Sequence, residues 1–582
     1  MALPPPLAAR ASGASAKGSL PRVSFQAPPG ATILVHGTYP KVVSSCLDPV
    51  QPLLHARYSG TIEVGRDTDG TLFVVGELPF EDYLTGIAEV PRTWPMEALK
   101  AQVVAARTYA LSRLGSSDPT GAHFGYQLCV TDHCQVYRGA GISGGPYGDR
   151  WRKAVSETSG EALVYKGRPA DTVYFSTSNG TTHSNAEIFE TAPLPYLRPV
   201  KENDDGASGL SHWHTSIPFA DVGRFLSPAG DWPSDTKVTS VKRTGSTVTV
   251  SGKKSSRSVD VVEFRTALNA WAHCLDPTSY PTVDRGSRLP QTVPSRWFSL
   301  RSSNGRVDLD GRGWGHGVGM VQWGAYGKAQ RGMAFDDILA AYYGGLRPRP
   351  FAEPSTIRVG IATGLRSVRI APSGGVAVTG RTLGPGPWLI RGGKRLRVER
   401  AAAPPTYIHA GSLRGPDRAK AGQTRHATVS LPQTSVVTLV LTSSGHDLEV
   451  TKPRTYEAGS TRIAWAGPEA PTGTYSLEAV VTDGTDIVRT KAIKLRFTGL
   501  PAVTPSPSPT PSPSPTLSPT AETSPTAPGT DPGRHRAFLI LIVTAIAAVI
   551  LGTVSIIYLY RKTGGGRGSR PPWERFDDGP PT

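Results

Sequence analysis

Cysteine is scarce in this chain of 582 residues, which holds only four: Cys46, Cys129, Cys134 and Cys274. So few cysteines exclude a small fold built on disulfides, and the length predicts two to four domains with apolar cores of their own. Signatures of nucleic-acid-binding folds are missing too, although Lys and Arg number 63 against 46 Asp and Glu. The net charge of +17 therefore favours an anionic wall or membrane surface as partner, and we expect no nucleic acid.

The first thirty residues lack an apolar run suited to a signal peptide. Ala537–Tyr560, in contrast, is 24 residues long and carries no charge. As a helix rising 1.5 Å per residue it would span roughly 36 Å, enough for a bilayer core of about 30 Å. Basic residues follow it, which predicts a single-pass membrane protein with an extracytoplasmic body and a cytoplasmic C-terminus. This requires a misassigned start; a tail anchor with a cytosolic body is the alternative.

The predicted fold class is an α+β catalytic-type domain with β-rich modules. A small all-β, Ig-like sandwich, a disordered Pro/Ser/Thr stalk and one transmembrane helix follow it. Alternating prolines in the stalk favour polyproline II, which could hold the body up to roughly 100 Å from the membrane. The predicted boundaries are a disordered N-terminus at 1–22, the site-bearing domain at 23–350 with its motifs in 73–350, a small β-rich module at 351–403, the sandwich at 404–498, the stalk at 499–533, the membrane helix at 537–560 and the tail at 561–582.

Four strands are predicted inside the sandwich, because short alternating runs there are separated by turn residues. These runs are Ser435–Thr442, Thr461–Ala466, Thr474–Thr482 and Ile487–Phe497. No polar constellation stands out among them, which favours a spacer or a wall-binding role over chemistry.

Two predicted helices meet at a proline-rich corner. The first is Phe80–Ala88, and the second begins at Trp94-Pro95, since proline is disfavoured inside helices but fits their first turn. Four apolar residues of the second helix recur at helical spacing and predict one buried face: Leu99, Val103, Ala106 and Ala110.

Glu89 stands beside this corner among apolar neighbours, which disfavour a carboxylate and raise its pKa as a general acid requires. A solvent-exposed or capping role is equally compatible with the pattern. Glu77, Glu81 and Glu97 are as eligible on these grounds, so the residues alone do not choose among the four.

The sequence PFEDYLTGIAEVPRTWPMEALKAQVVAARTYAL, from Pro79 to Leu111, resembles the first signature of the stage II sporulation protein D / LytB family. Its members include lytic transglycosylases that cleave peptidoglycan glycan strands, and enhancers of wall amidases. The resemblance implies that Glu89 is the catalytic acid and base. It also places Arg107 and Tyr109 among the expected substrate-binding residues.

Two further segments agree with this resemblance. Gly311–Gly327, GRGWGHGVGMVQWGAYG, resembles the C-terminal signature of the family and lacks the spacing of a dinucleotide or P-loop fingerprint. Its glycines are expected to let the backbone approach a sugar. Val173–Glu187 resembles a third family segment, and the substrate-binding residues expected from both segments are Ser176, Ser178, Asn179, His316, Gln322 and Trp323.

His123, Cys129, His133 and Cys134 lie within twelve residues and have the ligand chemistry of a structural zinc site. Adjacent His133 and Cys134 would have to diverge to reach one metal, and a Cys129–Cys134 disulfide is the alternative outside the cytoplasm. Cys46 and Cys274 could form a second bridge. No cofactor beyond this possible zinc is expected.

The prediction from these patterns is a lytic transglycosylase that cleaves peptidoglycan glycan strands with Glu89 as its one acid and base, since a typical hydrolase needs a second carboxylate. The alternative is a non-catalytic, peptidoglycan-binding enhancer of a wall amidase. Expected partners are the glycan strands, a wall amidase or other divisome and wall-remodelling proteins, and the membrane through the C-terminal helix.

Overall fold

The computed structural model describes residues 7–8, 21–38, 54–114, 119–281, 289–372, 376–378, 381–383, 386–443 and 446–499. The predicted stalk, the membrane helix predicted at Ala537–Tyr560 and the tail lie outside these residues. Within the described ranges, none of the helices is long and apolar enough to cross a bilayer.

Two β-sheets share the largest apolar core, and both combine strands from the start of the site-bearing region with strands that follow it. In the first, β6 (Leu72–Pro79) lies antiparallel between β5 (Thr61–Arg66) and β19 (Thr356–Leu365). In the second, β3 (Ile33–Thr38) pairs with β20 (Ser367–Pro372). The stretch 351–403 was predicted to be a separate module. Its strands instead complete the sheets begun by residues 22–79.

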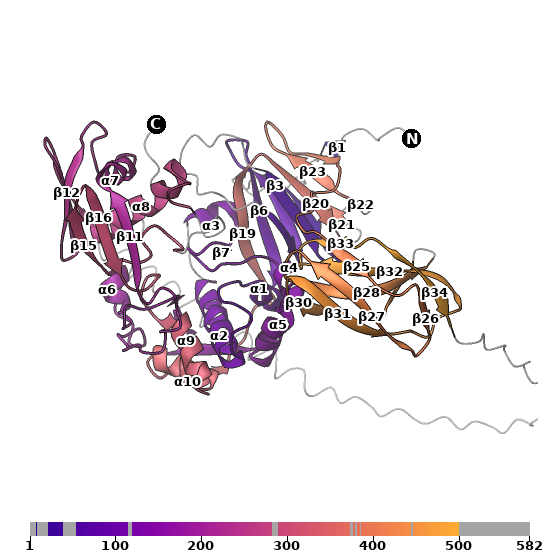
Figure 1. Cartoon of the computed structure of the whole chain (residues 1–582). Helices are drawn as coiled ribbons and strands as arrows, with labels where there is room; N and C mark the ends of the chain where they lie inside the picture. Colours follow the sequence, from indigo (N-terminus) through magenta and orange to yellow (C-terminus); the bar gives the residue numbers. More distant parts are fainter. Residues whose placement is uncertain are drawn as a thin grey trace, which may run out of the picture. The chain divides into compact units, whose positions relative to one another are not determined.

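The first sheet also holds β2 (Arg22–Gln26), β7 (Leu128–Cys129), β21 (Val376–Val378) and β22 (Arg381–Leu383). The second also holds β1 (Leu7–Ala8), β4 (His55–Tyr58), β23 (Trp388–Arg391) and β24 (Arg397–Arg400). Figure 1 shows β6 beside β19 in the first sheet and β3 beside β20 in the second.

The helix α2 (Met96–Arg113) is the centre of the helical layer and begins directly after Pro95, as predicted. It contacts α5 (Gly148–Glu157), β8 (Glu161–Tyr165), α9 (Gln322–Gln330) and α10 (Phe335–Tyr342). The predicted single buried face is wrong: thirteen consecutive or near-consecutive positions from Ala98 to Leu111 are buried, on every side of the helix. Small alanines make this possible because neighbouring elements approach the helix closely from all directions.

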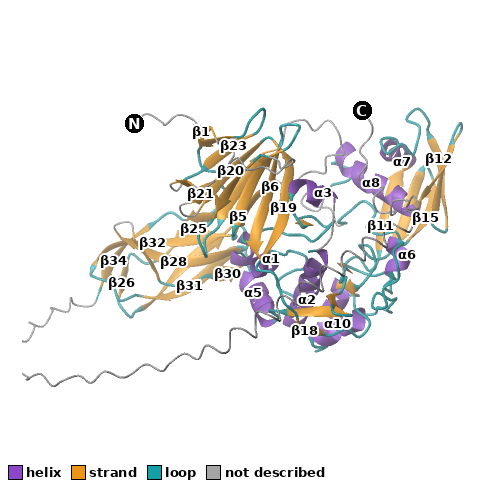
Figure 2. Ribbon diagram, turned by 180° about the vertical axis from the view of Figure 1, so that it is seen from behind, coloured by secondary structure: helices purple, strands orange, loops and turns teal. Residues whose placement is uncertain are grey.

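A second lobe is inserted before the Gly-rich segment, with a core of its own. One of its sheets is β11 (Trp213–Pro218), β16 (Arg306–Gly311) and β15 (Phe298–Ser303), and the other is β12 (Val238–Thr244), β13 (Thr247–Gly252) and β14 (Ser256–Asp260). The helices α7 (Phe219–Leu226) and α8 (Val261–Leu275) pack on these strands (Figure 2). The observed class is thus mixed α and β with several small sheets, in agreement with the coarse prediction.

The predicted all-β region around 404–498 is confirmed as two packed sheets with one core. The strand β28 (Ser435–Ser443) pairs with β32 (Gly473–Thr482), and β27 (Thr424–Leu431) with β31 (Gly459–Ala466). The last predicted strand is split into β33 (Ile487–Arg489) and β34 (Ile493–Thr498). Buried Thr490 lies at the break and bonds to the backbone of Ala479 through both its amide and its hydroxyl.

Polar residues join the sandwich to the two-sheet core, which the sequence did not indicate. Buried His55 lies 3.1 Å from Asp486, and its other ring nitrogen is 3.3 Å from Nδ1 of His36. Arg57 donates to the Thr485 carbonyl oxygen at 2.5 Å. Because these groups are buried and mutually paired, they fix where the sandwich attaches to strands β3 and β4.

Candidate functional site

Glu89 lies in the turn between α1 (Phe80–Thr85) and α2. The predicted first helix ends three residues earlier than expected, at Thr85. After Gly86 the chain extends alongside residues 136–137, and glycine permits this close approach because an added Cβ would meet the Tyr137 ring at 2.2 Å. The Ala88 amide donates to the Val136 carbonyl oxygen at 2.8 Å, so Glu89 leaves the helix and turns its side chain onto this neighbouring segment.

Three distant segments meet at the Glu89 carboxyl group. The Val136 amide donates to Glu89 Oε1 at 2.7 Å, and the Tyr174 hydroxyl lies 3.2 Å from the same oxygen. The Gln322 side chain also hydrogen-bonds to Glu89. Tyr174 is on β10 (Tyr174–Phe175), which pairs in parallel with β17 (Met320–Val321), and Gln322 follows β17 as the first residue of α9. This strand pair therefore delivers both side chains to Glu89.

Burial raises the pKa of Glu89 from 4.5 to about 7. The negative charge of Asp132 raises it further, while the Val136 amide, the Tyr174 hydroxyl wherever it donates to the carboxylate, and Gln322 favour the charged form and oppose the shift. Near neutral pH, both the acid and the carboxylate are consequently populated, so the side chain can give and take a proton. The other three eligible glutamates are engaged elsewhere: Glu77 with Arg358, Glu81 with Arg107, and Glu97 with the Phe335 amide.

The Gly-rich segment packs its backbone against the protein itself. Gly315 and Gly319 have φ values of +111° and +77°, and a Cβ added there would meet Phe175 Cβ at 2.7 Å and the Val173 carbonyl oxygen at 2.0 Å. Only glycine fits both the conformation and the space. These glycines are thus explained by close packing on β10, whereas approach to a sugar remains a prediction.

His316 is placed beneath Tyr174. Its Nε2 donates to the Tyr174 carbonyl oxygen at 2.8 Å, and its Nδ1 accepts from the Val318 amide at 3.1 Å. Burial lowers the pKa of the ring to about 4, so the imidazole is neutral at ordinary pH. Both nitrogens serve the backbone, so His316 positions β10, and the structure does not present it as a free donor to a ligand.

Arg107 is fully buried and is not brought to Glu89. Its guanidinium lies 2.7 Å from Glu353 and 3.0 Å from Glu81, and it donates to the Thr158 hydroxyl at 3.1 Å. Tyr109, also predicted to bind substrate, is buried and lies with its ring 4.7 Å from the Arg113 guanidinium. Arg107 and Tyr109 thus contact other residues of the protein, and their predicted role in substrate binding stays a prediction.

The three predicted polar residues of the third segment are also paired internally. Ser178 is buried, and its amide and hydroxyl both donate to Asp205 at 2.8 Å. The Ser176 hydroxyl lies 3.1 Å from that of Thr177, and the side-chain oxygen Oδ1 of Asn179 lies 3.3 Å from Nε2 of His183.

Trp323, the residue after Gln322, belongs to an aromatic cluster with Trp94 and Tyr326. Its ring lies 4.9 Å from Trp94 and 5.3 Å from Tyr326. Together with Pro91, Thr93, Pro95 and Gln330, these rings line a pocket of about 530 Å³. Pro91 is two residues from Glu89 in the sequence and Trp323 directly follows Gln322, while Glu89 itself is not among the lining residues.

The four predicted metal ligands do not come together. Cys129 and Cys134 form a disulfide with a Cα–Cα distance of 5.5 Å, and His123 lies 3.1 Å from Asp67 instead. Among the described residues, no group of three or more His, Cys, Asp or Glu side chains could hold a metal ion. Of the two alternatives the structure contains the disulfide, which closes the loop just before Val136. Cys46 lies outside the described residues, so its predicted bridge with Cys274 stays a prediction.

Gln135 and Tyr174 were missed from the sequence, although Tyr174 falls inside the recognised segment 173–187 and Gln135 directly follows Cys134. Gln135 is fully buried, and its amide connects Tyr174 with Tyr83 and with the backbone of α2. The position of Gln135 directly after Cys134 was the one sequence feature that could have drawn attention to it. Its hydrogen-bond partners could not be found in this way, because they come from segments far apart in the chain.

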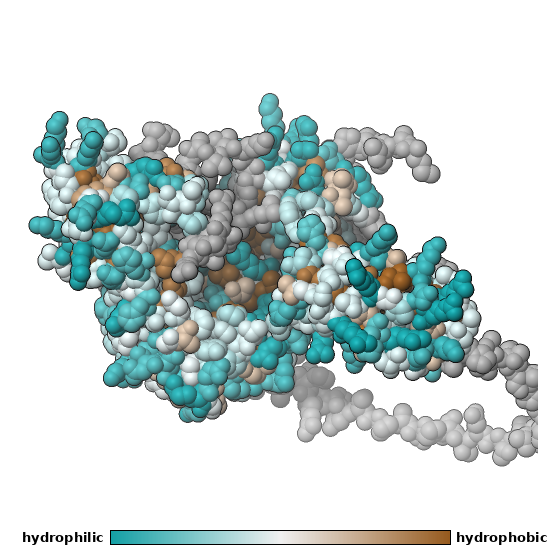
Figure 3. Space-filling view, viewed as in Figure 1, coloured by the Kyte–Doolittle hydropathy of each residue, from teal (hydrophilic) through white to brown (hydrophobic). Residues whose placement is uncertain are grey.

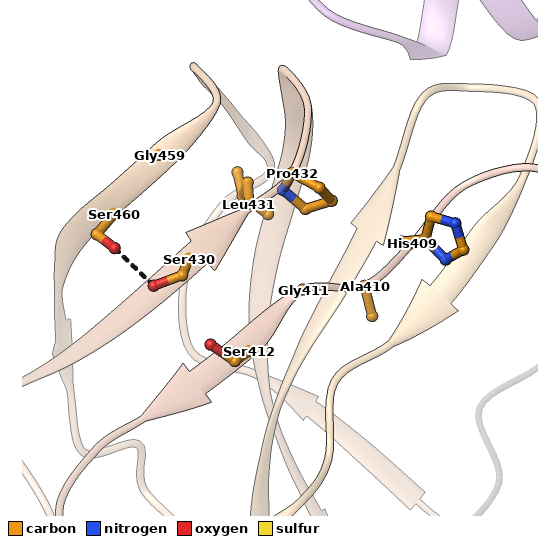
Figure 4. A pocket seen from close by; sticks show the side chains of 9 residues that line it. All are labelled: His409, Ala410, Gly411, Ser412, Ser430, Leu431, Pro432, Gly459 and Ser460. Carbon is orange, nitrogen blue, oxygen red and sulfur yellow. Dashed lines mark hydrogen bonds between the residues drawn. The ribbon is translucent and has the colours of Figure 1, made fainter.

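A second pocket, of about 630 Å³, lies in the sandwich (Figure 4). Its lining is formed by His409, Ala410, Gly411, Ser412, Ser430, Leu431, Pro432, Gly459 and Ser460. No carboxylate lines it, and it lies in a different part of the chain from Glu89. In the space-filling view, hydrophilic side chains cover most of the visible face and hydrophobic ones gather mainly in its hollowed centre (Figure 3).

The geometry defines a domain whose site centres on one partly buried glutamate with a nearly neutral pKa. A family model described as stage II sporulation protein matches residues 68–165, which include Glu89 and the disulfide. The stage II sporulation protein D of Bacillus subtilis is 30% identical over 47% of this chain and 74% of its own length. An uncharacterized protein of Brachyspira hyodysenteriae is 31% identical over 47% of this chain and 68% of its own length. The chain therefore belongs to the stage II sporulation protein D family.

A further relative in Bacillus subtilis is named amidase enhancer. It is 28% identical over 44% of this chain, and the match spans only 38% of that protein. Each of these similarities covers less than half of this chain.

Proposed function

We propose that this protein cleaves the glycan strands of peptidoglycan as a lytic transglycosylase, with Glu89 as general acid and then general base. The observation that carries the proposal is a single carboxyl group whose pKa of about 7 leaves it partly protonated at neutral pH. Family membership supports it by placing Glu89 inside the matched segment.

In the proposed reaction, protonated Glu89 donates its proton to the glycosidic oxygen as the bond from this oxygen to C1 of the muramyl sugar breaks. The bonding electron pair leaves with the oxygen, and the electron-poor C1 is attacked by the 6-hydroxyl of the same sugar. The proton of that hydroxyl passes to the Glu89 carboxylate. The products are a 1,6-anhydro end and a new chain end, and the acid is regenerated without water.

A variant at Asp132 distinguishes this outcome from hydrolysis. Asp132 is exposed on the disulfide loop, and its charge reaches Glu89 strongly enough to raise the pKa of Glu89. A second carboxylate across the substrate could activate water, which is the arrangement of glycoside hydrolases. We expect anhydro ends to persist in Asp132→Asn; loss of cleavage in that variant, with reducing ends from the wild type, would assign a hydrolase.

The test is incubation of the full chain with purified peptidoglycan, followed by mass spectrometry of the released fragments. We expect anhydro-muramyl ends from the wild type and a decrease of at least about 100-fold in Glu89→Gln, since proton transfer contributes 10²–10⁴-fold. Glu97→Gln is the matched control, because an amide oxygen can still accept from the Phe335 amide 2.9 Å away. Intact glycan, with wild type and Glu89→Gln indistinguishable, would contradict the proposal.

The second candidate is a peptidoglycan-binding protein that enhances a wall amidase without cutting glycan. The relative named amidase enhancer favours it. In that case Glu89→Gln would stimulate an added amidase as well as the wild type does. For either function we propose that the body lies outside the cell, anchored by Ala537–Tyr560 with the tail in the cytoplasm; protease accessibility of the body in intact cells tests this.

A further inference from the structure

We propose that Tyr174 is a positioning residue that accepts a hydrogen bond from protonated Glu89 and so keeps the acid loaded before the reaction. The inference rests on the proposed function for its use, but it is derived from hydrogen-bond directions around Gln135. It assigns to Tyr174 a role opposite to that of an ordinary donor to a carboxylate.

The argument begins at the carbonyl oxygen of Ala106, which can only accept hydrogen bonds. Nε2 of Gln135 lies 3.3 Å from it and 3.2 Å from the Tyr83 hydroxyl. The NH₂ group of Gln135 must therefore face α2, since the opposite orientation would bring two acceptor oxygens together. This leaves Oε1 of Gln135 facing Tyr174.

The next step concerns the one proton of the Tyr174 hydroxyl. Its oxygen lies 2.8 Å from Gln135 Oε1 and 3.2 Å from Glu89 Oε1. Gln135 is fully buried, so leaving its amide oxygen unpaired there would be unfavourable. The shorter contact and this penalty both direct the proton to Gln135. Tyr174 then turns its lone pairs towards Glu89.

Glu89 supplies the missing hydrogen when it is protonated. Its neutral acid donates to Tyr174, while an ionised Oε1 would face an oxygen with no hydrogen between them. The Val136 amide bonds to the same oxygen at 2.7 Å in either state. The chain of bonds from Ala106 to Glu89 is thus complete only when Glu89 carries its proton.

The remaining ionisable groups near this pair do not supply an alternative proton donor. Asp132 acts on Glu89 as a negative charge, and burial holds the pKa values of Tyr83 and Tyr174 well above 10. His316 is neutral and bonds to the Tyr174 backbone, not to its hydroxyl. Gln322 does not titrate.

The experiment follows the protonation of Glu89 directly, by ¹³C NMR of the full chain labelled at glutamate Cδ, with the Glu89 signal assigned from its loss in Glu89→Gln. In Tyr174→Phe we expect the pKa of Glu89 to fall by about one unit, because a hydrogen bond worth about 1 kcal/mol to the neutral acid is lost. Tyr343→Phe is the matched control: it removes a buried hydroxyl that donates to the Val173 carbonyl oxygen at 3.0 Å and should leave Glu89 unchanged.

A rise or no change in Tyr174→Phe would overturn the proposal, since a tyrosine that donates to the carboxylate predicts a rise. An equal fall in Tyr343→Phe would overturn it too, by showing general repacking. If Tyr174→Phe does not fold, Gln135→Met replaces it: the freed Tyr174 proton turns to Glu89 and lowers its pKa, and an unchanged pKa refutes the idea. Because this readout needs no glycan, it stands apart from failure of the proposed cleavage.

Discussion

Replacement of Arg107 by methionine separates a structural role from substrate binding. The guanidinium is fully buried and lies 2.7 Å from Glu353, whose side chain is only 15% exposed. Glu81, 37% exposed, is a weaker partner because water screens it. Removing one member of a buried ion pair leaves an uncompensated charge and typically costs about 3–5 kcal/mol. We expect Arg107→Met to be destabilised by roughly 3 kcal/mol.

The double variant Arg107→Met with Glu353→Leu makes the reasoning refutable. Replacing a whole buried ion pair with apolar residues of similar volume is often neutral or stabilising. We therefore expect the double variant to regain most of the lost stability, and its glycan cleavage with it, when urea unfolding and activity are measured on the same samples. Two equally stable variants that both lose activity through a higher KM would show instead that Arg107 touches substrate.

Three further predictions concern the surroundings of Glu89. The pKa of His316 is lowered in the folded protein, so the unfolded chain binds the extra proton first and stability should fall by roughly 2–3 kcal/mol as the pH drops from about 6.5 to 4. His316→Gln should flatten that part of a pH–unfolding profile; an unchanged slope would contradict it. Replacing Cys129 and Cys134 by serine should lower kcat several-fold with little change in overall unfolding, because the loop that supplies the Val136 amide is loosened; unaltered kcat would show that the loop is rigid without the bridge. Trp323→Ala should raise KM for glycan about tenfold with kcat nearly constant, as expected if the aromatic pocket holds sugar, and an unchanged KM would remove the pocket from the binding surface.

Local patterns allowed much of the fold to be predicted. Three of the four predicted sandwich strands match β28, β31 and β32 within one or two residues because alternation and turn residues are local signals, whereas the fourth is split and β27 was not predicted. The start of α2 followed from Pro95 in the same way. Which strands pair is a different matter: alternation in 356–365 predicts a strand but says nothing of β6 as its partner. For the same reason the burial of α2 on all sides could not be read from its sequence.

The candidate site was predicted in part. The resemblance selected Glu89, and the structure gives it the buried setting that its apolar neighbours had indicated. His316, Arg107 and Ser178 were predicted to bind substrate. The sequence pattern could not show that they are already paired within the protein, because their partners are backbone atoms and carboxylates from distant segments. Gln135 and Tyr174 were missed since hydrogen-bond directions depend on three-dimensional proximity alone.

The pairing of β6 with β19 makes assembly of the site a late event in the life of the chain. Leu78, just before α1, pairs with Ile357, so the sheet beneath the Glu89 turn closes only after nearly all of the family domain has been synthesised. Pairings between such distant residues are slow because a long loop must first be closed. A nascent or truncated chain that stops before residue 356 would therefore contain every residue that contacts Glu89 and still lack a competent site.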